Sequence, residues 1–141
     1  PVPAADIAGL RTVTQNVLTP ILADESVFSA RDAAEIIQTG AADLINIKLM
    51  KAGGIHAALR ICAVAESYGV QCMLGCMLES RLAVGAAAHL AAAKGVITMA
   101  DWDGPAYGDG DPLEGGPVLE GGVITLPDTP GIGFTHIPGF D

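Results

Sequence analysis

The sequence predicts an α/β protein built around a parallel sheet. Four short apolar runs with strand character alternate with stretches of helical periodicity, each about ten to fifteen residues long. Half of the 141 residues are apolar, so the chain can bury a sizeable core. Strands separated by helices of this length are typical of right-handed βαβ units. Periodicity alone leaves two arrangements open, an open sheet and an arc of a larger barrel.

The first elements are a helix, a short strand and a second helix. Apolar residues with helical spacing predict the first helix over residues 5–15, and a short apolar run predicts a strand over 21–23. Ser29 is a suitable N-cap for the second helix, and Gly40 is a suitable residue to end it.

Three further strands and two further helices follow. Residues 43–49 alternate between apolar and polar as a half-buried strand does. The remaining expected elements are a helix from 54 to 69, a strand over 70–74, an alanine-rich helix over 81–94 and a strand over 96–99.

The sequence changes character after Asp103. It becomes rich in glycine and proline, and the alternating segments 117–119 and 123–126 predict a hairpin that leaves the parallel sheet. We expect this tail to pack as a lid or brace.

Composition restricts the classes of partner. The net charge is −9, with 16 acidic against 7 basic residues, so there is no basic patch for nucleic acid, and no apolar stretch is long enough to span a bilayer. Three cysteines, Cys62, Cys72 and Cys76, are an odd number, and the first two lie in segments expected to be buried. We therefore expect a reduced, cytoplasmic protein.

Every expected strand is followed by charged residues. In α/β barrels the catalytic groups lie at the C-terminal ends of the strands. No glycine-rich phosphate-binding motif follows any strand, which argues against a nucleotide site. The residues at the four strand ends are Asp24-Glu25-Ser26, Lys48, Glu79-Ser80, and Asp101 with Asp103.

Lys48 is the most informative of these residues. Strand alternation places Asn46 and Lys48 on one face and the apolar residues 45, 47 and 49 on the other, which suits packing against helices. If the sheet is part of a barrel, Asn46 and Lys48 point toward the barrel axis, where an amine that is near other cations or partly desolvated has its pKa lowered and can act as a base near neutral pH. The alternative is structural neutralisation of Lys48 by Asp24. Lys51 lies beyond the strand, and we expect it to be a solvated loop lysine.

Asp24 is a candidate ligand for a metal ion. It directly follows a buried strand, and a carboxylate there is a suitable hard ligand for Mg²⁺. One carboxylate is too few for a site, and Glu25 and Ser26 could orient it or cap the next helix.

Taken together, the sequences at these strand ends resemble those of the enolase superfamily. Asp24-Glu25-Ser26 and the run Lys-x-x-Lys-x-Gly-Gly over 48–54 are similar to the muconate-lactonizing subgroup. Cys-Met-Leu-Glu-Ser over 76–80 agrees with this, and Asp-Trp-Asp over 101–103 narrows the resemblance to dipeptide epimerases of the L-Ala-D/L-Glu type.

The resemblance implies a (β/α)7β barrel of the TIM type, to which this chain contributes strands five to eight. Residues 1–103 would form part of the barrel domain, and residues 104–141 a tail that packs on the barrel or on a capping domain. The N-terminal half of the barrel and most of the capping domain would lie outside this sequence.

The resemblance also implies a chemistry, the Mg²⁺-dependent epimerisation of dipeptides by 1,1-proton transfer through an enediolate. Lys48 would be one of two acid/base lysines, and Asp24 would be a Mg²⁺ ligand. The implied substrate-binding residues are Glu79 and Ser80 near the carboxylate, and Asp101 and Asp103 at the α-ammonium.

Two alternatives stay open. The first is a muconate cycloisomerase or o-succinylbenzoate synthase-like enzyme, whose substrates carry no ammonium group. The second is a non-catalytic half-barrel fragment. A whole barrel of this type needs roughly 250 residues, so we expect the isolated chain to be inactive and to depend on its missing half or on a second copy in a homo-oligomer.

Overall fold

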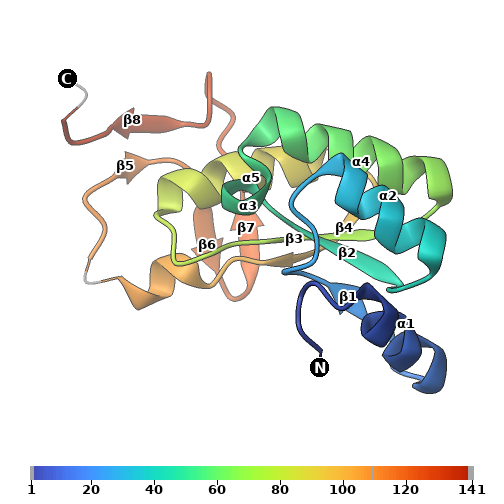
Figure 1. The fold of residues 1–141 in the computed structure, drawn as a ribbon. Helices are drawn as coiled ribbons and strands as arrows, with labels where there is room; N and C mark the ends of the chain where they lie inside the picture. Colours follow the sequence, from blue (N-terminus) through green and yellow to red (C-terminus); the bar gives the residue numbers. More distant parts are fainter. Residues whose placement is uncertain (1, 109, 140–141) are drawn as a thin grey trace.

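The computed structural model describes residues 2–108 and 110–139, which form a parallel sheet, the helices that cover it and a tail (Figure 1). The main sheet has four strands in the order β1-β2-β3-β4, and every neighbouring pair is parallel. The strands are β1 (Leu22–Ala23), β2 (Leu44–Lys48), β3 (Cys72–Gly75) and β4 (Ile97–Asp101). The α/β class and the consecutive parallel order are as predicted.

The four long helices also lie where periodicity placed them. They are α1 (Ile7–Asn16), α2 (Ala30–Thr39), α4 (Ile55–Tyr68) and α5 (Arg81–Ala93). The Ser29 hydroxyl accepts a hydrogen bond from the Asp32 amide at the start of α2, and Gly40 ends this helix in the left-handed region at φ 63°. Helices α2, α4 and α5 lie on one side of the main sheet (Figure 1).

One short helix departs from the sequence prediction. Leu49 was expected to extend the second strand, but it begins α3 (Leu49–Ala52). This single turn ends at Gly53, whose amide donates to the Leu49 carbonyl at 3.0 Å and whose φ of 88° suits glycine. A helix this short has too few residues for its periodicity to be recognised.

The core lies between the sheet and the helices. Ile45 and Ile47 are fully buried toward the helices, as strand alternation predicted. Helix α2 contributes Ile36, and α4 contributes Ile61 and the free cysteine Cys62. None of the helices in the described segments is both long and apolar enough to cross a membrane.

The tail forms two small sheets of its own. The predicted hairpin is present as β6 (Val118–Glu120) paired antiparallel with β7 (Val123–Thr125). The 3₁₀ helix η1 (Gly104–Tyr107) and the pair of β5 (Glu114–Gly115) with β8 (Phe134–His136) were not predicted. Of the expected tail range 104–141, positions 109, 140 and 141 lie outside the described residues.

Candidate active site

The candidate residues lie at the C-terminal ends of the four parallel strands. The strand register places Lys48 opposite Gly75 and Gly75 opposite Asp101, so the three positions form one row across the sheet. Asp24 directly follows β1 at the same edge. The fold therefore brings the charged strand ends of the sequence to one edge of the sheet, where barrel enzymes carry their catalytic groups.

Asp24 lies between two lysines. The Lys48 Nζ is 2.9 Å from Asp24 Oδ2, and the Lys51 Nζ donates to Asp24 Oδ1 and, at 2.5 Å, to the Asp24 main-chain carbonyl. The side chain of Lys51 is only 7% exposed and lies 5.7 Å from the centre of the Phe28 ring. The prediction of a solvated Lys51 is wrong, because the turn of α3 directs this lysine back toward the strand ends.

The two lysines keep Asp24 ionised. Burial alone would raise the pKa of this carboxyl, but the hydrogen bonds and charges of Lys51 and Lys48 outweigh burial, and the pKa lies below its ordinary value of 3.8. The side chain is a quarter exposed, so solvent weakens this interaction.

The pKa of Lys48 differs from the prediction. Burial pushes the pKa of Lys48 down, but the hydrogen bond and charge of Asp24 outweigh burial, so the pKa lies above its ordinary value of 10.5. The prediction of a lowered pKa is wrong for this arrangement, because the partner carboxylate faces the amine directly. Lys48 is therefore an ammonium group at neutral pH, able to donate a proton.

Asn46 and Lys48 share the face of β2 that is turned away from the core helices, as predicted. A Cβ atom at Gly75 would lie 2.9 Å from Asn46 Oδ1 and 3.3 Å from Lys48 Cε, which shows how closely the three residues approach. Asn46 is 2% exposed, and its Oδ1 has no hydrogen-bond donor among the described residues. A buried amide oxygen of this kind needs a partner.

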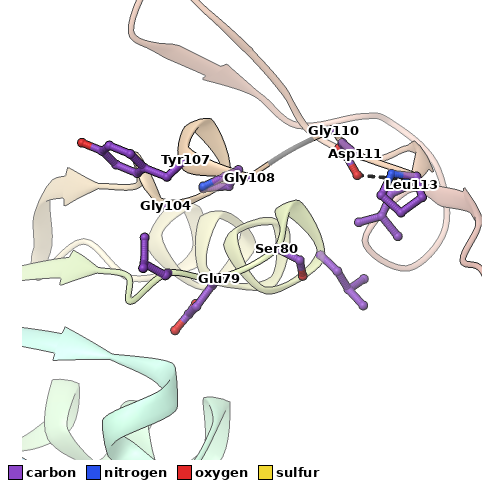
Figure 2. Close-up of a pocket in the computed structure, with 12 residues that line it drawn as sticks. Glu79, Ser80, Gly104, Tyr107, Gly108, Gly110, Asp111 and Leu113 are labelled. Atoms are coloured by element: carbon purple, nitrogen blue, oxygen red, sulfur yellow. Dashed lines mark hydrogen bonds between the residues drawn. The ribbon is translucent and has the colours of Figure 1, made fainter.

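Glu79 and Ser80 line a pocket of about 400 Å³ between the start of α5, η1 and the first part of the tail. Figure 2 shows Ser80 at the start of α5, across from the segment that carries Gly108, Asp111 and Leu113, whereas the Glu79 carboxylate points away from that segment. Glu79 Oε1 accepts a hydrogen bond from the Met77 amide at 3.3 Å, which fixes the turn after β3.

Asp101 and Asp103 line a second pocket, of about 370 Å³, between the end of β4 and the β6–β7 hairpin. The Tyr107 hydroxyl donates to Asp103 Oδ2 at 3.1 Å. Both carboxylates are exposed to solvent. The Asp-x-Asp pair of the sequence therefore faces a common space from the last strand.

Cys76 lies near the carboxylates of both pockets. Burial raises the pKa of its thiol, a hydrogen bond with the Gly104 backbone lowers it, and the charges of Glu79, Asp103 and Asp101 raise it again. A Cβ atom at Gly104 would lie 2.5 Å from the Met77 carbonyl oxygen, so glycine allows η1 to lie against the turn after β3. The ends of β3 and β4 thus form one acidic region.

Ser26 was expected either to orient Asp24 or to cap the next helix. In the structure its hydroxyl donates to the Ala4 carbonyl at 2.8 Å, so it holds the segment before α1 and does not orient Asp24.

The described residues supply only part of a metal site. They contain no group of three or more histidine, cysteine, aspartate or glutamate side chains placed to hold one ion. Asp24 is a hard oxygen donor held in a fixed orientation, which fits one Mg²⁺ ligand, but Mg²⁺ needs several more oxygen atoms. The described histidine, cysteine, aspartate and glutamate side chains therefore do not complete such a site by themselves.

Comparison with known proteins confirms the family resemblance that the sequence predicted. The chain is 56% identical over 137 residues to the L-Ala-D/L-Glu epimerase of Clostridium acetobutylicum, covering 97% of this chain and 38% of that protein. It is 47% identical over 138 residues to the hydrophobic dipeptide epimerase of Enterococcus faecalis, covering 96% of this chain and 39% of that protein. The chain therefore spans less than two fifths of these relatives.

Solved structures have the same fold over this length. The substrate-liganded L-Ala-D/L-Glu epimerase of Bacillus subtilis superposes with a TM-score of 0.93 at 52% identity, covering 96% of this chain and 38% of that chain. The dipeptide epimerase of E. faecalis, complexed with Mg and the dipeptide L-Leu-L-Tyr, gives 0.92 at 47% identity, covering 96% and 39%. Residues 1–137 match the family described as enolase C-terminal domain-like, and the chain belongs to that family.

Proposed function

We propose that the protein to which these residues contribute is a Mg²⁺-dependent epimerase of dipeptides of the L-Ala-D/L-Glu type. The observation that carries the proposal is the row of charged strand ends, in which Lys48 and Asp24 are in contact at one end and Asp101 lies at the other. High identity to dipeptide epimerases over almost the whole chain supports it.

Lys48 is the proposed acid/base residue of this chain. Its Nζ is protonated next to Asp24, so it is ready to return a proton to the substrate α-carbon. A second lysine on the opposite face, outside this sequence, would remove the proton in that direction of the reaction. In the reverse direction the two lysines exchange roles, which is the proposed 1,1-proton transfer.

Asp24 is the proposed metal ligand of this chain. When bound, Mg²⁺ would supply positive charge beside the substrate carboxylate and so stabilise the charge that develops there. Lys51 supports this role, because its contacts with the carboxylate and the main chain of Asp24 fix the orientation of the ligand.

The four remaining residues are proposed to bind the two ends of the substrate. Asp101 and Asp103 would pair with the α-ammonium group, because two solvated carboxylates at one pocket favour a cation. Glu79 and Ser80 would line the site near the substrate carboxylate. The acidic pair favours a dipeptide over the substrates of a cycloisomerase or an o-succinylbenzoate synthase-like enzyme, which carry no ammonium group.

The remaining proposals concern the assembly. We propose that residues 1–103 belong to the barrel and 104–141 to a tail, that the missing part of the barrel completes the site, and that the protein is a homo-oligomer. The described cysteines, Cys62, Cys72 and Cys76, are free, which supports a reducing, cytoplasmic environment. A fragment of this length acting alone is the non-catalytic alternative.

The test is a fusion of this chain to the complementary N-terminal part of the B. subtilis epimerase. We expect the fusion to exchange the α-proton of the Glu residue of L-Ala-L-Glu for deuterium in D₂O with Mg²⁺, measured by NMR. The N-terminal part of the B. subtilis epimerase without this chain is the control for background exchange. A folded fusion that incorporates no deuterium above this control would refute the proposed activity.

A further inference from the structure

The start of helix α5 forms a docking face for the tail. Arg81 and Gly85 are four residues apart, so they lie on the same face of the helix. A Cβ atom at Gly85 would lie 3.1 Å from the Phe134 ring and 3.2 Å from Pro117, so both tail residues pack where glycine leaves space. The tail therefore contacts α5 along this one face.

Arg81 makes the polar contacts of this face. Its Nη2 donates to the Leu113 carbonyl at 2.5 Å, its Nη1 donates to the Gly115 carbonyl at 2.6 Å, and its Nε pairs with the Asp111 carboxylate. The guanidinium also lies 5.4 Å from the centre of the Phe134 ring. One side chain thus binds a tail segment that is 30 to 34 residues away in sequence.

These contacts hold both sides of the pocket that contains Glu79 and Ser80. Asp111 and Leu113, both bound by Arg81, line the pocket on the tail side (Figure 2). Ser80, which lines the opposite side, directly precedes Arg81 in the chain. Arg81 is therefore the residue that joins the two sides.

The chemistry of the contact requires arginine. Three carbonyls, those of Leu113, Gly115 and Pro117, and one carboxylate accept from the three nitrogens of one planar group, whereas a lysine ammonium is a compact point charge without this fork. The side chains of Arg81 and Asp111 are 27% and 38% exposed, so the ion pair alone contributes little. The hydrogen bonds to the main chain carry most of the interaction.

We propose that Arg81 is a positioning residue, which binds residues 111–115 to the start of α5 and thereby fixes the Glu79–Ser80 turn and the tail side of the pocket. Its effect on substrate rests on the proposed epimerase function. Its effect on the tail does not, and the experiment measures the two separately.

The first measurement is hydrogen exchange of the fusion described above. We expect Arg81→Met to speed amide exchange over 113–116 and over 77–80 by about tenfold or more, while α4 amides stay unchanged. Arg81→Lys should give a smaller increase and Asp111→Asn a smaller one still. Lys94→Met, which removes an ion pair with Glu66 at the far end of α5, is the matched control and should change neither segment.

The second measurement is the kinetics of the fusion described above. Arg81→Met should raise KM for the dipeptide several-fold more than it lowers kcat, because it displaces residues that contact substrate and leaves Lys48 in place. Unchanged exchange over 113–116, or faster exchange with an unchanged KM, would overturn the proposal.

Two failures of the experiment can be told apart from a failure of the proposal. If Arg81→Met unfolds the chain, the α4 amides also exchange fast, and the exchange and KM of Arg81→Lys then decide by the same criteria. If the parent fusion does not epimerise dipeptides, the proposed function fails, and exchange over 77–80 and 113–116 decides on Arg81.

Discussion

The two ends of the charged row differ in how their charges are balanced. At the β1–β2 end, one carboxylate, Asp24, is shared by two lysines, both of which are largely buried. At the β3–β4 end, Glu79, Asp101 and Asp103 take part in no ion pair among the described residues. With Glu25 beside Asp24, the charges at the β1–β2 end are balanced, whereas the β3–β4 end has an excess of negative charge. A substrate with an ammonium group, such as a dipeptide, is complementary to that excess.

The largest expected effect is at the lysine end. In the fusion with the N-terminal part of the B. subtilis epimerase, Lys48→Ala should slow epimerisation by roughly 10²- to 10⁴-fold in at least one direction, the range typical of losing a general acid or base. Turnover from each epimer of the dipeptide measures this. Lys94→Ala, on the surface of α5, is the matched control. Retained turnover and exchange in both directions would remove Lys48 from the mechanism.

Substitutions at the acidic end should have a smaller effect on catalysis, and this effect should depend on the charge of the substrate. Asp101→Asn and Asp103→Asn should each raise KM for the dipeptide by about ten- to a hundredfold, the range expected for losing a charge-assisted hydrogen bond. An N-acetylated dipeptide, which has no ammonium group, is the control substrate, and its kinetics should not change with either substitution. Equal effects on both substrates would contradict ammonium binding at this end.

The pairing of Asp24 with Lys51 predicts a change in stability. Lys51→Met should lower the free energy of unfolding by about 1–3 kcal/mol, because it leaves three oxygen acceptors near the strand ends without their buried donor. Urea denaturation of the fusion followed by circular dichroism measures this. Met50→Ala, at an exposed neighbouring position, is the control. A loss no greater than that of the control would mean that Lys51 is not a structural partner of Asp24.

The smallest expected effect is the pH dependence of the same pair. The pKa of Asp24 is lowered in the folded chain, so its ionised form contributes stability that is fully present above the ordinary value of 3.8 and is lost as pH falls through the lower folded value. The stability difference between the parent chain and Asp24→Asn should therefore shrink between pH 5 and pH 2. A difference that stays constant over this range would contradict the lowered pKa.

Sequence patterns predicted the parts of the molecule that repeat a regular period. Alternation placed Ile45 and Ile47 toward the helices and Asn46 and Lys48 on the opposite face, and the structure agrees. The same pattern could not reveal the single turn of α3. For that reason Lys51 was misassigned, because the turn that directs it back toward Asp24 begins only after Lys48, at Leu49.

The tail was only partly predictable for a related reason. The β6–β7 hairpin has alternating residues on both sides of a Gly-Gly turn, whereas β5 and β8 are two and three residues long and pair across a long gap in sequence. The contacts of Arg81 are to main-chain carbonyls, which carry no sequence signature. Long-range contacts of this kind become visible only when the fold is known.

The lack of a side chain at Gly75 restricts how this site can diversify. A Cβ atom there would lie 2.9 Å from the buried Asn46 side chain and 3.3 Å from the end of the Lys48 side chain, so any larger residue would crowd both. Mutational libraries aimed at new substrate preference should therefore yield no active variants at this position. Tolerated variation is expected instead around the 370 Å³ pocket, at Leu119 and Ile124, where the hairpin faces Asp101 and Asp103 without touching the strand interior.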